Sequence, residues 1–224
     1  MASRAELEQL RKALNRLSVT AQAELAAQVA GLDPVATRRV LMAAYPQIVA
    51  EFGTASAALA ADMVEAWASE LGIRPSLVLS PGVVPDRATW GVSRAFGLPD
   101  PMGNLLLDAD KLVKRPYRET VQQSAHASRA AWARVPSGAK TCSFCSMTAS
   151  RGAVYRSSGS AGGDHKFHGG CDCQVVMVRG PEDFPDGYDP GDLFQSYQDA
   201  RDGVEGRKTT SAILSQMRVI TGSN

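Results

Sequence analysis

The chain has 224 residues, of which 44% are hydrophobic and 21% are charged, and its formal net charge is +1. This composition is typical of a folded globular protein and excludes an intrinsically disordered one. No apolar run approaches the roughly 18 residues of a membrane-spanning helix, and residues 1–18 are charged rather than signal-like. We therefore expect no membrane association and a reducing cytoplasm, where paired cysteines bind metal more often than they form disulfides.

The first 71 residues predict helices that pack as an antiparallel bundle. Ser18 or Thr20 is expected to cap a second helix, and Asp33 with Pro34 to open a third. Pro46 is expected to bend or break the pattern that follows. The first helix carries four leucines on one face: Leu7, Leu10, Leu14 and Leu17.

Three prolines interrupt the helical pattern in residues 74–87, which predicts a connector with at most one short strand. A short helix is expected near 89–96. A long helical stretch follows over roughly 103–134, and Pro116 within it predicts a kink or break.

The C-terminal part begins with a loop of small residues at 157–163. The apolar stretch QVVMV at 174–178 predicts a strand. Two helices are expected after it, near 193–202 and 209–219.

All four cysteines and two of the three histidines lie between residues 139 and 178. Cys142 and Cys145 form a C-x-x-C pair, and His168, Cys171 and Cys173 form H-x-x-C-x-C. Two such segments can direct sulfur and nitrogen ligands to one tetrahedral ion, and zinc favours this set. We expect a structural Zn²⁺ held by Cys142, Cys145, His168 and one of Cys171 or Cys173, a choice that stays open.

Other interpretations of this cluster are buried cysteines that act as small hydrophobic residues, or disulfides. A zinc deaminase or zincin is excluded because neither H-x-E with P-C-x-x-C nor H-E-x-x-H is present. Asp164 and His165 resemble the strand that carries the general base of HNH nucleases. That fold also needs a later Asn and His, and after His168 the chain has no histidine and only Asn224. We expect His165 to be a loop residue or an outer partner of the site.

Charge is unevenly distributed along the chain. Residues 111–166 contain ten basic and two acidic residues, whereas residues 180–206 contain eight acidic and one basic residue. Two solvated faces explain this pattern, and so does a basic surface for phosphates or for an acidic partner. The candidate contacts of such a surface are Lys111, Lys114, Arg115, Arg118, Arg129, Arg134 and Lys140.

The stretch RVPSGAKTCSFCSMTASRGAVY, followed by FHGGCDCQVV, resembles the MuF-like minor capsid (head morphogenesis) proteins of tailed bacteriophages, especially phages of actinobacteria. The resemblance covers roughly residues 134–178. It implies a low-copy protein of the phage head interior, made in the host cytoplasm, that acts near the portal in head assembly, DNA packaging or release. It also implies metal binding at the matching positions Cys142, Cys145, His168, Cys171 and Cys173.

The partners that this resemblance implies are the portal and the major capsid or scaffolding proteins. The basic stretch over residues 111–166 adds packaged DNA, bound without sequence preference, as a hypothesis. Some relatives carry a toxin domain, but only about 45 residues follow Val178, too few for another domain. We therefore expect a protein that is not an enzyme. The alternative is a zinc-binding nucleic-acid-binding protein or an HNH-like nuclease.

The expected fold is mainly α with a small α+β module. An N-terminal helical bundle, or long helices, precedes a segment stapled by a zinc knuckle and containing short strands. The expected divisions are a helical region (1–73), a connector and long central helix (74–138), a Cys/His metal-binding module (139–178), and an acidic turn region with C-terminal helices (179–224).

Overall fold

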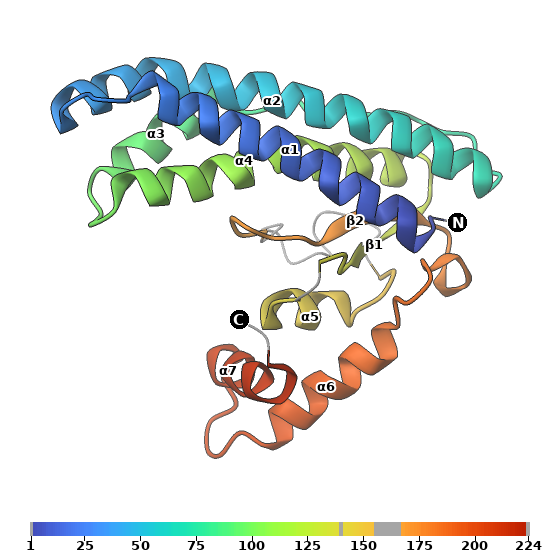
Figure 1. Cartoon of the computed structure of the whole chain (residues 1–224). Coiled ribbons are helices and arrows are strands. Elements are labelled where there is room, and N and C mark those ends of the chain that lie inside the picture. Colours follow the sequence, from blue (N-terminus) through green and yellow to red (C-terminus); the bar gives the residue numbers. More distant parts are fainter. Residues whose placement is uncertain (1, 139–140, 155–166, 223–224) are drawn as a thin grey trace.

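The computed structural model describes residues 2–138, 141–154 and 167–222 (Figure 1). Within them, seven α-helices, one 3-10 helix and two strands follow one another along the chain. Their bounds are α1 (Arg4–Gln28), α2 (Pro34–Glu70), α3 (Pro85–Ala95), α4 (Pro101–Ala127), β1 (Ala131–Val135), α5 (Ser143–Ala149), β2 (Gln174–Val178), η1 (Pro181–Asp183), α6 (Pro190–Asp202) and α7 (Thr210–Thr221). The prediction of a mainly α protein with a small sheet is confirmed.

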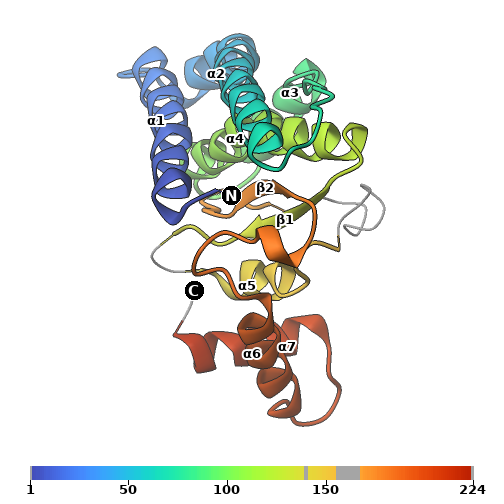
Figure 2. The same ribbon diagram turned by 90° about the vertical axis from the view of Figure 1, so that its right-hand side faces the viewer.

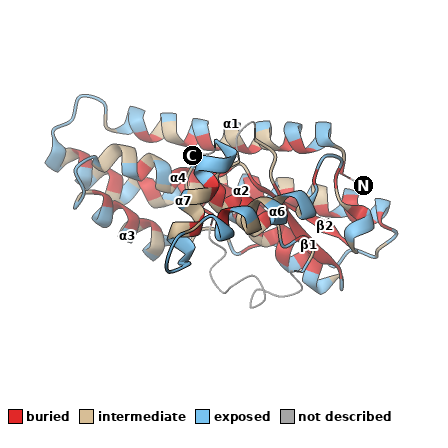
Figure 3. Cartoon of the chain, turned by 90° about the horizontal axis from the view of Figure 1, so that it is seen from below, coloured by how far each residue is buried: buried red, intermediate tan, exposed pale blue. Residues whose placement is uncertain are grey.

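Helix α4 is the element on which the other parts of the molecule assemble. It contacts α1, α2 and α3, with which it forms one layer, and it also contacts both strands (Figures 1 and 2). Helix α5 packs on β1, and α6 and α7 pack on α5 at the end of the molecule farthest from α2. Both strands are buried over their whole length, whereas exposed residues follow the outer sides of the helices (Figure 3).

Two large apolar clusters hold these layers together. One contains only residues of α1 to α4, including Tyr45 and Leu112. The other joins the helices to the sheet and to α5, and includes Tyr117, Trp132 and Val176. Complete burial of one such aliphatic or aromatic side chain contributes about 1.5–3 kcal/mol. The second cluster contains residues from all four of the expected divisions of the chain, 1–73, 74–138, 139–178 and 179–224. The boundaries of these divisions stay predictions.

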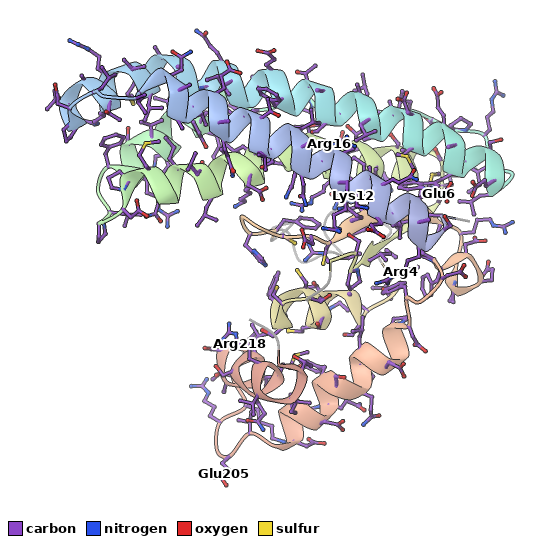
Figure 4. All side chains as sticks on the ribbon, viewed as in Figure 1. Arg4, Glu6, Lys12, Arg16, Glu205 and Arg218 are labelled. Atoms are coloured by element: carbon purple, nitrogen blue, oxygen red, sulfur yellow. The ribbon has the colours of Figure 1, made fainter. Side chains whose placement is uncertain are left out.

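Helix α1 is a single helix, so the predicted start of a second helix at Ser18 or Thr20 is wrong. Ser3 caps α1 and forms a reciprocal capping box with Glu6. Ser18 is buried and its hydroxyl donates to the Asp110 carboxylate at 2.6 Å instead of capping a helix. The outer side of α1 carries charged residues, of which Figure 4 labels Arg4, Lys12 and Arg16.

Helices α2 and α4 both continue through an internal proline, so the breaks considered at Pro46 and Pro116 do not occur. Small residues of α2 face Pro116: a Cβ on Gly53 would lie 3.2 Å from its ring. Ser56 donates to the carbonyl oxygen of Val113 at 2.6 Å, one turn before the proline. A proline cannot donate to the carbonyl oxygen four residues earlier, here that of Leu112, and Gly53 leaves room in α2 for the proline ring. The predicted cap of α2 by Asp33 is confirmed.

The central helix is shorter than predicted, and its expected last turns form a strand. Helix α4 ends at Ala127, and Arg129 has a positive φ of 57° in the turn that leads to β1. Strand β1 pairs antiparallel with β2, the strand predicted at 174–178, with Ala133 opposite Val176 and Val135 opposite Gln174. No strand is found in the described connector between α2 and α3. The strand register places the residues after β1 beside those just before β2.

Candidate metal centre

The C-x-x-C pair lies at the start of α5. Cys142 is the N-cap residue, and its Sγ accepts a hydrogen bond from the backbone N–H of Cys145 at 3.4 Å. This bond satisfies one of the first-turn N–H groups that a helix leaves without an internal partner. The two cysteines are therefore held on one end of a short helix, with Cys145 buried and Cys142 half-buried.

The second half of the cluster is a tight turn over residues 168–171. The N–H of Cys171 donates to the carbonyl oxygen of His168 at 3.3 Å, and Gly170 has a φ of +74°. Gly169 lies so close to α4 that an added Cβ would collide with the carbonyl oxygen of Leu107. Both glycines are thus required, one by its backbone conformation and the other by close packing.

All five predicted ligands converge on one small region. Cys142 Sγ lies 3.0 Å from His168 Nε2, and Cys145 Sγ lies 3.9 Å from the same nitrogen and 3.3 Å from Cys171 Sγ. Cys145 belongs to two groups whose donor atoms all lie within 4.8 Å of one another, one with Cys142 and His168 and one with Cys171 and Cys173. These residues line a cavity of about 40 Å³. All four cysteines are free, so the disulfide interpretation is wrong for this structure.

His168 is oriented for ligation through Nε2. Its Nδ1 lies 2.7 Å from the carbonyl oxygen of Gly169, and because that oxygen can only accept, Nδ1 is the donor. In the neutral imidazole this leaves the lone pair on Nε2, which faces the thiols of Cys142 and Cys145. A backbone acceptor on the second ring nitrogen is the usual support of a metal-bound histidine.

The thiols and the imidazole shift one another's pKa strongly. Contact with the Cys145 thiol, and then with His168, lowers the pKa of Cys142 to about 4. Contact with Cys142 raises the pKa of His168 to about 9. The pKa of Cys171 is lowered, above all by the thiol of Cys145, whereas contact with Cys142 raises the pKa of Cys145 itself. Contact with Cys145 lowers the pKa of Cys173, but Cys171 and burial outweigh it and raise that pKa. The Cys142 and Cys171 thiols thus lose their protons easily, one in each half of the motif, whereas Cys145 and Cys173 hold theirs more tightly.

Arg118 of α4 provides an independent test of whether a metal fits. Its guanidinium is buried, and Nη2 donates to the carbonyl oxygens of Cys171 at 2.9 Å and Cys173 at 3.5 Å. Its Nε and Nη1 have no hydrogen-bond partner, and no carboxylate in the described ranges forms an ion pair with it. Burial lowers the pKa of Arg118, and Cys171 and Cys173 oppose that shift. A zinc ion with three or four thiolate ligands carries the negative charge that this buried cation lacks.

Asp110 is a supporting residue that the sequence analysis missed. Its carboxylate accepts from the N–H of Gly170 at 2.7 Å and from Ser18 at 2.6 Å, and it pairs with Lys114 at 2.6 Å. It therefore ties the turn between His168 and Cys171 to α4 and α1. The available signal in the sequence was the spacing of Asp110 and Lys114, which is that of an intrahelical ion pair.

The structure separates the predicted basic residues into two sets. Lys114, Arg118 and Arg134 are buried, so they do not belong to a basic surface, and this part of the interpretation is corrected. Arg134 donates to Thr148 Oγ1 at 2.9 Å, and its guanidinium lies 3.7 Å from the centroid of the Phe167 ring, over which Arg118 also lies. These buried cations support the fold around the cysteines.

The remaining basic residues are accessible to different extents. Arg115 is exposed and pairs with Glu119 at 2.5 Å, Arg129 is exposed in the turn after α4, and Lys111 is half-buried beside His168 and Trp90. Lys140 and His165 lie outside the described residues, as does Asp164. No single basic face is formed by the predicted set, as far as the described residues show.

The fold and the site together define a mainly helical protein whose four cysteines and one histidine form a cluster compatible with a metal site. The chain matches the family model described as VG15 protein over residues 1–200 and so belongs to the VG15 protein family. This is a family of phage proteins, and the chain is therefore a phage protein. No curated protein and no solved structure matches the chain significantly. None of the described helices combines the length and hydrophobicity needed to cross a bilayer.

Proposed function

We propose that this phage protein is a non-enzymatic, MuF-like minor capsid protein that acts near the portal in head assembly, DNA packaging or release. The observation that carries the proposal is the convergence of both halves of the motif, C-x-x-C at the start of α5 and H-x-x-C-x-C in the segment before β2, on one small region. The resemblance to minor capsid proteins rests on these two halves, and the fold joins them into one unit. Membership in a phage protein family is consistent with this role.

The ion that fits the cluster is Zn²⁺, in a structural role. Cys142, Cys145 and His168 would hold it with Cys171 or Cys173, and the ion would cross-link α5 to the segment before β2. Sulfur-rich zinc sites without a retained water stabilise folds rather than catalyse reactions. Cys145, Cys171 and Cys173 are buried, which supports a closed site.

The proposed partners are the portal and the major capsid or scaffolding proteins, in the interior of the phage head. DNA binding without sequence preference is proposed for the accessible cations only: Lys111, Arg115 and Arg129. Counterion release would make such binding weaken steeply as salt rises. A gel shift with duplex DNA at low salt tests this part. If the DNA is not retarded, DNA binding is ruled out and only the protein partners remain in the proposal.

Mass spectrometry of purified virions tests the assignment directly. We expect the chain in the particles at a copy number below that of the major capsid protein and comparable to that of the portal. Elemental analysis of the purified protein is expected to give one zinc per chain. Absence from virions, or Mg²⁺-dependent nicking of DNA by the pure protein, would contradict the proposal and favour the nuclease alternative.

A further inference from the structure

The connector between α2 and α3 lies along α4 in an extended conformation, held by a ladder of hydroxyl groups. The backbone N–H groups of alternate residues donate to side-chain oxygens spaced four residues apart on α4. The bonds join Ser76 to Ser128 Oγ at 2.8 Å, Val78 to Ser124 Oγ at 2.9 Å and Ser80 to Thr120 Oγ1 at 2.9 Å. Ser124 Oγ also lies 3.3 Å from the carbonyl oxygen of Val78.

These three hydrogen bonds also determine where the N–H and C=O groups of the intervening residues, Leu77 and Leu79, point. In an extended chain, the N–H and C=O groups of successive residues point to opposite sides. Those of Val78 face α4, so those of Leu77 and Leu79 face away from it. Neither residue has a backbone hydrogen bond within the described part of the chain. The outer side of the connector is therefore an open strand edge.

The same segment exposes apolar side chains. Leu77, Val78 and Leu79 are 41%, 38% and 56% exposed, and residues 74–79 are all exposed. Pro75 and Pro81 lie on either side and limit the free edge to residues 76–80. A row of unpaired backbone groups with exposed apolar side chains is a template for an added strand. The connector runs on the outside of the helical layer, between the end of α2 and α3 (Figure 2).

We propose that this edge pairs with the same segment of a second copy of the chain, antiparallel and about a two-fold axis at Val78. The sequence of residues 76–80, SLVLS, reads the same in both directions, so two-fold pairing places Leu77 opposite Leu79 of the second copy. In that register, Leu77 and Leu79 are in hydrogen-bonded pairs, and Val78 faces Val78 in a non-hydrogen-bonded pair.

The register agrees with the backbone directions already fixed by α4. Residues of a non-hydrogen-bonded pair turn their N–H and C=O groups away from the partner strand, as Val78 does toward Ser124. Pairing supplies partners for both edge residues of each copy and covers three exposed apolar side chains per copy.

Two double variants test the pairing and its register. L77K/L79K places like charges opposite each other across the axis, whereas L77K/L79E places the new lysine of one copy opposite the new glutamate of the other. Both variants lose the same two leucines at exposed positions, so both should fold. We expect the wild type to dimerise with increasing concentration in sedimentation velocity, L77K/L79K to weaken dimerisation at least about tenfold, and L77K/L79E to dimerise better than L77K/L79K.

A matched control is Val219→Lys, which removes an apolar side chain that is 77% exposed on α7 and should leave dimerisation unchanged. A wild type that stays monomeric at all concentrations, or an L77K/L79K variant that dimerises as well as the wild type, would overturn the proposal. Equal behaviour of the two double variants would overturn the antiparallel register.

Amide hydrogen exchange gives a second, independent readout on the wild type. In dilute protein we expect slow exchange at Ser76, Val78 and Ser80, whose N–H groups are bonded to α4, and fast exchange at Leu77 and Leu79. At concentrations where the protein dimerises, Leu77 and Leu79 should become protected. Dimerisation without protection of these two amides would place the interface elsewhere and refute the pairing.

Discussion

Asp110 shows how one buried side chain connects distant parts of the chain. It is 7% exposed, it pairs with Lys114, and it binds Ser18 and the turn that carries His168 and Cys171, two of the proposed ligands. Removing one partner of a buried ion pair leaves the other charge uncompensated, which costs far more than the pair contributes in net terms.

We therefore expect Asp110→Asn to lower the free energy of unfolding by about 3 kcal/mol or more, because Lys114 would remain charged and buried. Urea denaturation measures the change. The control is Asp202→Asn, which breaks an exposed pair with Lys208 and should change the stability by less than about 0.5 kcal/mol. A similar small effect of both substitutions would show that Lys114 finds another partner.

Arg118 tests the charge of the metal centre. If thiolates around a zinc ion supply its missing counter-charge, Arg118→Met should weaken zinc binding by about tenfold or more, as loss of an outer partner of a metal site typically does. Competition with a chromophoric chelator measures the affinity. The control Arg115→Met changes an exposed position three residues earlier on α4 and should leave zinc affinity unchanged. Arg118→Lys keeps the positive charge and should bind zinc more tightly than Arg118→Met does. Equal affinities for all three variants and the wild type would remove Arg118 from the site.

At the scale of single residues, the sequence predicts the cysteine and histidine cluster because its spacing is local. The roles of Lys114, Arg118 and Arg134 could not be predicted in the same way. The contacts of Arg118 and Arg134 with the Cys171 carbonyl and the Phe167 ring are formed only in the tertiary structure, whereas the pair of Asp110 with Lys114 is local and only its burial depends on the fold.

Among the elements, the start of α2 at Asp33 and Pro34 and the strand β2 are predicted well, whereas the predicted helix start at Ser18 or Thr20 is wrong. Strand β1, AWARV, is not, because its alanines and arginine suit a helix as well as a strand and only pairing with β2 decides between them. The ring of Pro116 in the continuous helix α4 likewise packs against Gly53, a residue of a different helix. Local propensity was overridden by packing in both places.

The hydroxyl ladder is an element-scale contact whose worth can be measured. Ser124→Ala removes the partner of the Val78 N–H in a half-buried position, and we expect a loss of about 1–2 kcal/mol in unfolding free energy. The Val78 amide should also exchange faster. Ser76→Ala removes a nearby exposed hydroxyl while keeping the Ser76 N–H, and should be neutral in urea denaturation. Neutral behaviour of Ser124→Ala would mean that water replaces its hydroxyl.

For the molecule as a whole, we expect metal removal to destabilise the part around the sheet and α5 more than the helical layer α1–α4. The first apolar cluster consists only of α1–α4 residues, whereas the sheet and α5 adjoin the cysteines. We expect a chelator to lower the midpoint of thermal unfolding and to expose residues around 141–154 and 167–178 to proteases, while the helical layer keeps most of its circular dichroism.

The matched control for this experiment is Cys142→Ser, which lacks one proposed ligand. This variant should already be less stable than the wild type and should respond little to the chelator. A wild type whose thermal midpoint and protease pattern are unchanged by chelation would contradict a stabilising metal.

The order of elements along the chain also sets the order in which they leave the ribosome. The first apolar cluster is complete at Val113, before any cysteine has been synthesised. Asp110 and Arg118 therefore emerge as part of a helical platform that can fold first, since domains fold from the N-terminal side during synthesis. The turns that carry the cysteines and His168 then meet anchors that are already in place, so capture of the proposed metal ion would follow the folding of the helical layer.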